Sequence, residues 1–203
     1  FEKHGMTNLG YFTPAKNDAN QLVYFLSYPS AEARAKAWDG FRDDEAWKRA
    51  KADSEANGPL LAKDGIKSVL LAATDYSPAV TVAKADPPRT FELRTYTATP
   101  GNLAALNARF RDHTVGLFQK HGITNLWYWT LAPGQEGGDV TLVYLLAHKS
   151  AEAKDQSFKA FAADPAWQAA RAESEKTAGG PLTVPKTGVV SQLLVPTDYS
   201  PLK

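Results

Sequence analysis

The chain has 203 residues, 43% hydrophobic and 22% charged, which is enough for one large or two small domains with apolar cores. Its 23 basic and 22 acidic side chains nearly balance, which argues against nucleic acid or an anionic membrane surface as a partner. It has no cysteine, which excludes disulfides, thiolate catalysis and cysteine-based metal sites, and no apolar run approaches the roughly 20 residues that span a bilayer.

The chain contains an internal repeat. Phe1–Thr13 and Phe118–Thr130 share Phe, Lys, His, Gly, Thr, Asn, Leu, Tyr and Thr in the same order. Further matches follow in the same order: Leu22–Tyr24 with Leu142–Tyr144, and Thr74–Pro78 with Thr197–Pro201. We therefore divide the chain into a first repeat (1–78), a linker (79–90) and a second repeat (91–203).

The second repeat is complete, and its patterns predict its elements. Alternating polar and apolar residues indicate strands, and apolar residues three or four positions apart indicate helices. Ser150 and Asp164-Pro165 are typical helix starts, so the second helical segment is expected in two pieces. In chain order we predict a strand at 91–99, a helix from 102 to a terminal glycine at 122, strands at 123–131 and 140–147, helical segments from 150, and a strand at 187–195.

This order predicts an α+β fold with ferredoxin-like (βαββαβ) repeats. Each would form a four-stranded antiparallel sheet with both helices on one face. The bare face of such a sheet is apolar here and needs a cover. Two repeats in one chain can cover each other, sheet against sheet.

The first repeat starts late, because Phe1 aligns with Phe118 and nothing corresponds to residues 91–117. A sheet without that strand and helix exposes an edge. We expect the missing residues to exist in the natural protein; the alternative is a homo-oligomer in which a neighbouring chain completes the first repeat. Because the chain begins with Phe1 and not Met, removal of a targeting segment stays open, and with it the choice between a cytoplasmic and an exported protein.

Four short motifs stand out in the second repeat: Glu92–Tyr96, Pro100-Gly101, Phe110–Thr114 and Phe118–Gly122. Together these motifs resemble the NIPSNAP family. The resemblance implies the dimeric α/β-barrel fold, in which two ferredoxin-like sheets close into a barrel, here within one chain. That superfamily also contains cofactor-free monooxygenases and haem enzymes, but the family supplies no catalytic residues to carry over.

Three histidines are candidates for chemistry. His121 and its counterpart His4 fall on the apolar stripe at the end of a helix, where capping of carbonyl groups or a hydrogen bond in the core is favoured over a role as pocket acid or base. His113 lies at the rim of that stripe and is the better candidate for a pocket wall. The catalytic candidates are therefore His113 and His121, and His4 is a candidate for ligand binding.

Glu92, Arg94 and Tyr96 share one face of the first strand of the second repeat. Polar side chains in a half-buried row need partners. A structural ion pair between Glu92 and Arg94 is favoured, and the alternative is that the guanidinium of Arg94, beside Tyr96, holds an acidic ligand.

The aromatic hairpin of the second repeat supplies further ligand-binding candidates. Alternation puts Asn125, Trp127 and Trp129 on one face and Tyr128 on the other, with Tyr144 on the neighbouring strand. Such aromatic residues usually form core.

The first repeat has Gly10 and Phe12 where the second has the two tryptophans, and Asn8 where the second has Asn125. The smaller residues predict more space on one side of a barrel and therefore a single site, with Asn8 as a further candidate. Trp47 and its counterpart Trp167 are expected to pack helices on the sheet, and the TDYSP sequences to form turns with local bonds from Asp and Ser.

Three functional hypotheses remain. We favour a binding or interaction module that holds a small apolar or aromatic ligand or a protein partner. The alternatives are a cofactor-independent monooxygenase or isomerase, with His113 or His121 as base and Arg94 and Asn125 as anion holders, and haem binding through a histidine. No metal site and no cofactor is predicted, because the four histidines are scattered and no phosphate-binding loop is present.

Overall fold

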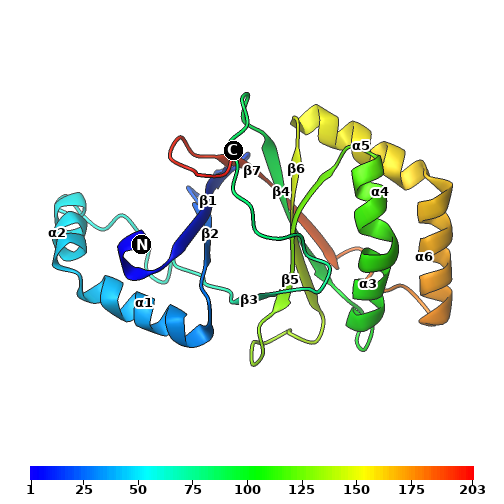
Figure 1. Cartoon of the computed structure of the whole chain (residues 1–203), viewed down its shortest axis with the longest axis horizontal. Coiled ribbons are helices and arrows are strands. Elements are labelled where there is room, and N and C mark those ends of the chain that lie inside the picture. The colour runs from blue at the N-terminus through cyan, green and yellow to red at the C-terminus, as the bar shows by residue number, and fades with distance from the viewer.

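The computed structural model describes residues 1–203, whose strands form one antiparallel seven-stranded sheet in the order β2-β1-β7-β4-β6-β5-β3 (Figure 1). The first repeat contains η1 (Glu2–His4), β1 (Thr7–Pro14), β2 (Val23–Ser27), α1 (Ala31–Asp43), α2 (Glu45–Ser54) and β3 (Leu71–Ala73). The second contains β4 (Thr90–Thr97), α3 (Leu103–Arg109), η2 (Phe110–Thr114), α4 (Val115–Lys120), β5 (Thr124–Leu131), β6 (Thr141–His148), α5 (Ala151–Ala163), α6 (Pro165–Thr177) and β7 (Val189–Pro196).

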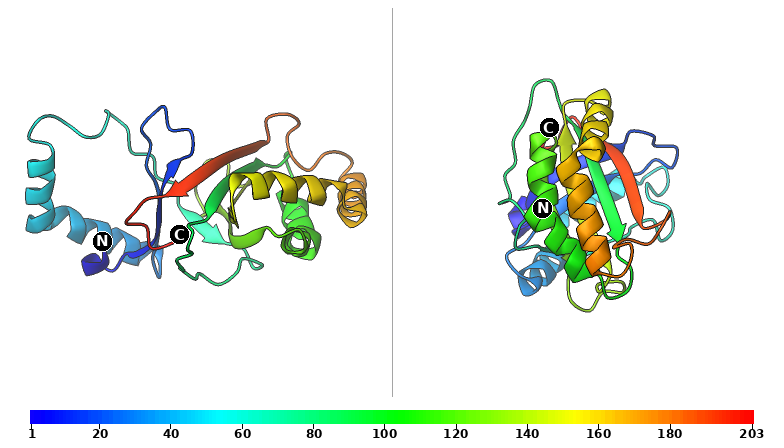
Figure 2. Two further views of the ribbon diagram at one scale, coloured as in Figure 1. Left: turned by 90° about the horizontal axis from the view of Figure 1, so that it is seen from above. Right: turned by 90° about the vertical axis from the view of Figure 1, so that its right-hand side faces the viewer.

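The second repeat has the predicted ferredoxin-like fold. Its strands stand in the order β7-β4-β6-β5, and its helices lie together on one side of the sheet, at the opposite end of the molecule from α1 and α2 (Figure 2). The predicted caps are present: Ser150 Oγ accepts from the N–H of Ala153 at 3.1 Å, and Asp164 Oδ1 accepts from that of Ala166 at 2.8 Å. Gly122, with φ +76°, ends the first helix.

The first helix of the second repeat differs from the single helix expected. It is divided by η2, a π-helical turn in which Thr114 Oγ1 donates to the carbonyl of Arg109 at 3.1 Å. A π-turn is a single turn with one extra residue inside an α-helix, and the spacing of apolar residues did not identify it.

Two apolar cores lie on opposite faces of the sheet. On the interior face, away from the helices, the two repeats meet as predicted: the rings of Phe12 and Phe91 are 4.9 Å apart, and those of Phe25 and Trp129 are 5.7 Å apart. The second core lies between the sheet and the helices of the second repeat and includes Leu106, Phe110, Phe118, Tyr128, Tyr144 and Leu182. The strands of the two repeats thus form one curled, barrel-like sheet.

The last strand of each repeat pairs with the other repeat. β7 pairs with β1, and β3 pairs with β5. Beyond each strand the TDYSP sequence continues the exchange: Thr74 N donates to the carbonyl of Tyr128 at 3.0 Å, and Thr197 N donates to that of Tyr11 at 2.9 Å. The two repeats are therefore related by an approximate two-fold axis.

The prediction of local bonds in the TDYSP turns holds for serine, since Ser200 Oγ donates to the carbonyl of Leu202 at 2.8 Å, but the turns also bond to the other repeat. Ser77 Oγ accepts from the backbone N–H of Tyr128 at 2.9 Å, and Asp75 forms two 2.8 Å contacts with Arg111 of the second repeat. Local bonding rules do not anticipate these partners, because only the exchange of strands brings them together.

The exchange also shows where the first repeat is incomplete. In the second repeat β4 pairs with both β6 and β7. Their counterparts in the first repeat are β2 and β3, which are the two outer strands of the sheet and have no strand between them. The sheet therefore ends at two edges that flank the position equivalent to β4.

Candidate functional site

The polar row on β4 lies on the helix side of the sheet. Glu92, which is fully buried, holds Arg94 through an Oε1–Nη1 contact of 2.6 Å. Its carboxylate also meets the ring nitrogen Nε2 of His148 at 3.0 Å and accepts from Ser191 Oγ at 2.5 Å. Arg94 Nη2 donates to the hydroxyl of Tyr96 at 3.2 Å. The favoured ion pair is present, and its other partners come from the two neighbouring strands β6 and β7 and from Tyr96 of β4 itself.

Electrostatics and aromatic contacts hold this cluster. Burial alone would raise the pKa of Glu92, but His148, the charge of Arg94 and Ser191 outweigh it and lower that pKa to about 2. The guanidinium of Arg94 lies 4.7 Å from the ring centre of Phe158, a cation–π contact. Burial raises the pKa of Tyr144 well above its ordinary value.

Two members of the cluster were missed from the sequence. His148 and Ser191 lie on β6 and β7, on either side of Glu92, and only the pairing of those strands brings them there. The alternation of β6 does put His148 on the same face as Tyr144, which was the available signal. The Tyr144 hydroxyl, His148 Nδ1 and Arg94 Nε are buried without a hydrogen-bond partner in the chain.

His121 and His4 make the same contact in the two repeats. His121 Nε2 is 2.7 Å from Asp164 Oδ2, and His4 Nε2 is 2.7 Å from Asp44 Oδ2. A neighbouring lysine adds a 2.6 Å contact to each carboxylate. The hydrogen bond from Lys120 has the larger effect and that from His121 the next, and they lower the pKa of Asp164 well below its usual range. Each histidine fastens the end of one helix to the N-terminal cap of another.

The other catalytic candidate lies elsewhere. His113 is exposed on η2 and makes no side-chain hydrogen bond. The structure does not bring His113 together with Arg94, whose side chain is 14% exposed and packs against Phe158 of α5.

The expected face of Asn125 was wrong. A β-bulge between Asn125 and Trp127 shifts the register, so Asn125 lies on the helix side, where its Oδ1 accepts from the hydroxyl of Tyr128. The first repeat has the same bulge, and Asn8 Oδ1 accepts from the hydroxyl of Tyr11 at 2.5 Å. One extra residue in a strand reverses the alternation on which the prediction relied.

The expected space beside Gly10 is absent. Trp127 and Trp129 are buried on the interior face. The ring of Phe12 lies so close to Gly10 that a Cβ placed there would be 2.6 Å from it. Phe12 therefore occupies the volume that the missing tryptophan side chain leaves.

Two clefts of the molecule are open and lie at the surface. One, of about 350 Å³, lies between α6 and the loop before β7. The other, of about 400 Å³, lies between α4 and the start of β5 and is lined by Pro78, Val115, Gln119, Gly122, Ile123, Thr124 and Asn125. Among the predicted ligand-binding residues, only Asn125 lines either cleft.

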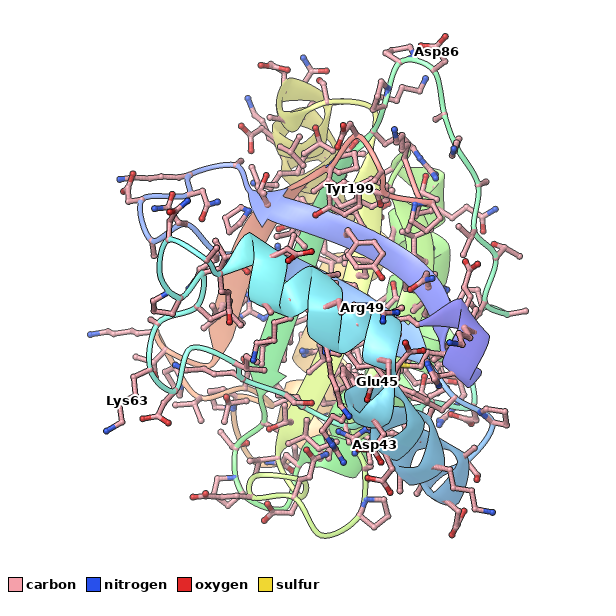
Figure 3. All side chains as sticks on the ribbon, turned by 90° about the vertical axis from the view of Figure 1, so that its left-hand side faces the viewer. Asp43, Glu45, Arg49, Lys63, Asp86 and Tyr199 are labelled. Carbon is pink, nitrogen blue, oxygen red and sulfur yellow. The ribbon has the colours of Figure 1, made fainter.

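The helix side of the first repeat presents a large exposed aromatic surface. Tyr24 is 37% exposed, whereas its counterpart Tyr144 is fully buried. Leu60 in Gly58-Pro59-Leu60 is 69% exposed, whereas Leu182 of the matching Gly-Pro-Leu sequence is fully buried. We call this surface the open face; Figure 3 looks onto it, with α2 in front and Tyr199 beside β1. Its connected rings are those of Tyr11, Tyr24 and Tyr199. Trp47 and Leu60 are further exposed apolar residues of the first repeat.

In the second repeat a helix covers the equivalent surface. The ring of Phe110 lies 5.1 Å from that of Tyr144 and 5.9 Å from that of Tyr128. In the first repeat the rings of Tyr11 and Tyr24 stack at 5.7 Å, much as their counterparts Tyr128 and Tyr144 do at 5.2 Å. The aromatic platform is thus the same in both repeats. In the first repeat the ring of Phe1 lies 6.3 Å from that of Tyr24, but no counterpart of Phe110 and its helix covers the platform.

The sheet edge at β3, beside the open face, has backbone groups without hydrogen-bond partners. β3 has three residues, whereas its counterpart β7 has eight. The residues Ile66–Val69 correspond to Val189–Gln192, which pair with β4, but they make no backbone–backbone hydrogen bond of their own. They lack partners because no strand lies between β2 and β3.

Other classes of site receive no support from the side chains. No group of three or more histidine, aspartate or glutamate residues is arranged to hold a metal ion. None of the helices has the length and apolar character needed to cross a membrane.

Comparison with known proteins identifies the family and the fold. No curated protein matches the chain. A NIPSNAP family protein with unknown function from Agrobacterium tumefaciens is 18% identical over 59% of this chain and 98% of its own, with a TM-score of 0.46. A NIPSNAP domain protein from Burkholderia xenovorans is 22% identical over 54% and 96%, with a TM-score of 0.43.

A putative monooxygenase from Fusobacterium nucleatum is 12% identical over 95% of this chain and 76% of its own, with a TM-score of 0.51. This likeness concerns the fold. The NIPSNAP family matches in two segments, residues 1–78 and 91–201, which agrees with two repeats. Because these segments cover nearly the whole sequence, the chain belongs to the NIPSNAP family.

Proposed function

We propose that this protein is a binding module whose open face accommodates a strand followed by a helix, as the equivalent face of the second repeat accommodates β4 and α3. One observation carries the proposal: β2 and β3 are free edges, whereas their counterparts β6 and β7 pair with β4 between them. Addition of a strand would satisfy the backbone of Ile66–Val69, and a helix after it would cover Tyr24.

A protein segment fits better than a small apolar ligand or a substrate. The interior face is filled by Phe12, Trp127 and Trp129, and the two clefts are open at the surface. The enzyme hypothesis requires a histidine base beside a bound substrate, but neither His113 nor His121 lines either of the two clefts described above.

The test is a chain in which a second copy of residues 90–117 is joined ahead of Phe1, so that the added strand and helix are held near the open face. We expect a higher melting temperature and slower hydrogen exchange at the amides of 66–69. The control carries a scrambled version of the same segment. If the two chains have equal melting temperatures and equal exchange rates, the open face does not accept a strand and helix.

A further inference from the structure

The cleft beside α6 combines cationic and hydroxyl side chains. Its volume is about 350 Å³, and it lies between α6 and the loop that leads from α6 to β7 (Figure 2). Arg171 and Glu175 line it from α6, and Thr183 and Lys186 line it from the loop. All of these residues belong to the second repeat, so the cleft forms without any part of the open face.

The charges around this cleft do not balance. Glu175 Oε1 accepts from Arg171 Nε at 3.0 Å, and the same oxygen lies 3.5 Å from Arg109 Nη1. Two guanidiniums and one carboxylate leave one positive charge. Lys186 adds a second, because it is exposed and its ammonium forms no ion pair with the chain. An anion in the cleft would therefore meet two positive charges without a counter-charge.

Arg171 has hydrogen-bond donors to offer. Arg109 is only 5% exposed, and its guanidinium lies 5.2 Å from the ring centre of Trp167, so its position beside Glu175 is fixed by packing. Arg171 is 59% exposed and uses only Nε toward Glu175, which leaves both of its Nη groups without a partner in the chain. Free guanidinium N–H groups of this kind bind oxyanions, phosphate in particular.

The backbone at Lys186 indicates that this lysine serves a ligand and not the loop. Its φ is +68°, a left-handed conformation that favours glycine, asparagine and aspartate over other residues. Counted from the two Gly-Pro-Leu sequences, its counterpart in the first repeat is Asp64, with φ +56°. The first repeat thus uses a residue suited to this conformation. The second repeat has a lysine there at a cost to the loop, and the lysine brings a positive charge to the cleft.

We propose that this cleft binds the phosphate group of a small soluble phosphorylated molecule, with Arg171 donating to its oxygens and Lys186 supplying the second positive charge. A phosphate monoester carries a charge of about −1.5 to −2 at pH 7, which matches two positive charges, whereas a carboxylate matches one. The hydroxyl of Thr183 has no partner in the chain and is a further donor. This site goes beyond the function proposed above and does not depend on it.

The experiment follows the backbone amides of residues 183–188 in the full chain by NMR while inorganic phosphate is added at constant ionic strength. We expect shifts that saturate. Lys186→Asn and Arg171→Gln should each weaken phosphate binding about threefold to fivefold, and the double variant about tenfold or more. Because asparagine tolerates positive φ, Lys186→Asn should melt at an equal or higher temperature, so that its loss of binding is not a loss of folding.

The matched control is Lys51→Gln. Lys51 on α2 is the counterpart of Arg171, and its removal changes the net charge of the chain by the same amount. Phosphate binding should be unchanged in this variant. An equal loss for Lys51→Gln would mean that total charge and not the cleft attracts phosphate, and would overturn the site. Amides of 183–188 that do not respond to phosphate in the unmodified chain would overturn it as well.

Two further ligands test the chemistry. Acetate carries one charge and should bind at least about threefold more weakly than phosphate; equal affinities would overturn the assignment of a doubly charged group. Sedimentation with phosphatidylcholine vesicles that contain phosphatidic acid separates a lipid headgroup from a soluble phosphate. The chain should stay in the supernatant, since its 23 basic and 22 acidic side chains nearly balance. Sedimentation that Lys186→Asn abolishes would contradict the soluble ligand and assign the cleft to a lipid.

Discussion

The hydroxyl of Ser77 accepts a hydrogen bond from the backbone N–H of Tyr128 at 2.9 Å, and this bond fastens the end of the first repeat to the central hairpin of the second. Ser200 and Tyr11 form the reciprocal bond at 3.0 Å. Because the sheet is shared by both repeats, these two bonds close it at the points where the repeats exchange strands.

Ser77→Ala should therefore destabilise the whole chain and not the first repeat alone. The change leaves the N–H of the buried Tyr128 without its acceptor, which costs about 1–2 kcal/mol of unfolding free energy. Urea unfolding followed by far-UV circular dichroism measures it. Ser54→Ala is the control, because the Ser54 hydroxyl bonds only within the exposed end of α2. Equal stability of the two variants would contradict a role for the cross-repeat bond.

Replacing glycine with alanine should change the unfolding free energy in opposite directions at two positions. At Gly10 an added Cβ would lie 2.6 Å from the ring of Phe12, so Gly10→Ala should cost about 1–3 kcal/mol of unfolding free energy. At Gly116, on the exposed side of α4, no atom lies within 4 Å of an added Cβ, and Gly116→Ala should stabilise by about 0.5–1 kcal/mol. Both are read from the same unfolding curves, and a stabilising Gly10→Ala would show that the Phe12 ring does not fill that space.

These positions also show what the sequence could and could not predict. The repeat, the order of strands and helices, and the caps at Ser150 and Asp164 followed from periodicity and short-range preferences, which depend on neighbours in the chain. The face of Asn125 did not, because a bulge changes the alternation without changing composition. The filled space beside Gly10 depends on the rotamer of Phe12, which is a property of packing.

The candidate site followed from the sequence only in part. That the first repeat lacks a counterpart of residues 91–117 was visible from the alignment of Phe1 with Phe118. The sequence did not show that this leaves an open face with free edges at β2 and β3. That result depends on the exchange of strands between the repeats, in which β3 pairs with β5 of the second repeat. Pairing between distant strands is not encoded in any local pattern.

Two matched leucines, one in each repeat, test whether the open face is uncovered in the chain without any added segment. Leu182 is fully buried against the helix layer, so Leu182→Ala should cost about 2–4 kcal/mol of unfolding free energy. Leu60 is 69% exposed, so Leu60→Ala should change it by less than about 0.5 kcal/mol. In the chain with the copy of residues 90–117 ahead of Phe1, Leu60→Ala should become destabilising. A large cost for Leu60→Ala without that copy would mean that the open face is already covered.

The buried ion pair of Glu92 with Arg94 makes a prediction about pH. Replacing Glu92 with Gln leaves the guanidinium buried without its counter-charge, which should cost about 3–5 kcal/mol of unfolding free energy near neutral pH.

That cost should vanish in acid. The folded pKa of Glu92 is about 2, below its ordinary value of 4.5, so the folded state binds the proton less readily than the unfolded state. The resulting stability, roughly 3 kcal/mol, is present above pH 4.5 and is lost as the pH falls from 4.5 toward about 2. Other carboxylates with lowered pKa values, such as those of Asp44 and Asp164, are present in both proteins and cancel in the difference between wild type and Glu92→Gln. Urea unfolding of the two proteins at pH values from 7 to 2.5 measures that difference, which should shrink steadily below pH 4.5. A difference that stays constant over this range would mean that the charge of Glu92 does not stabilise the fold.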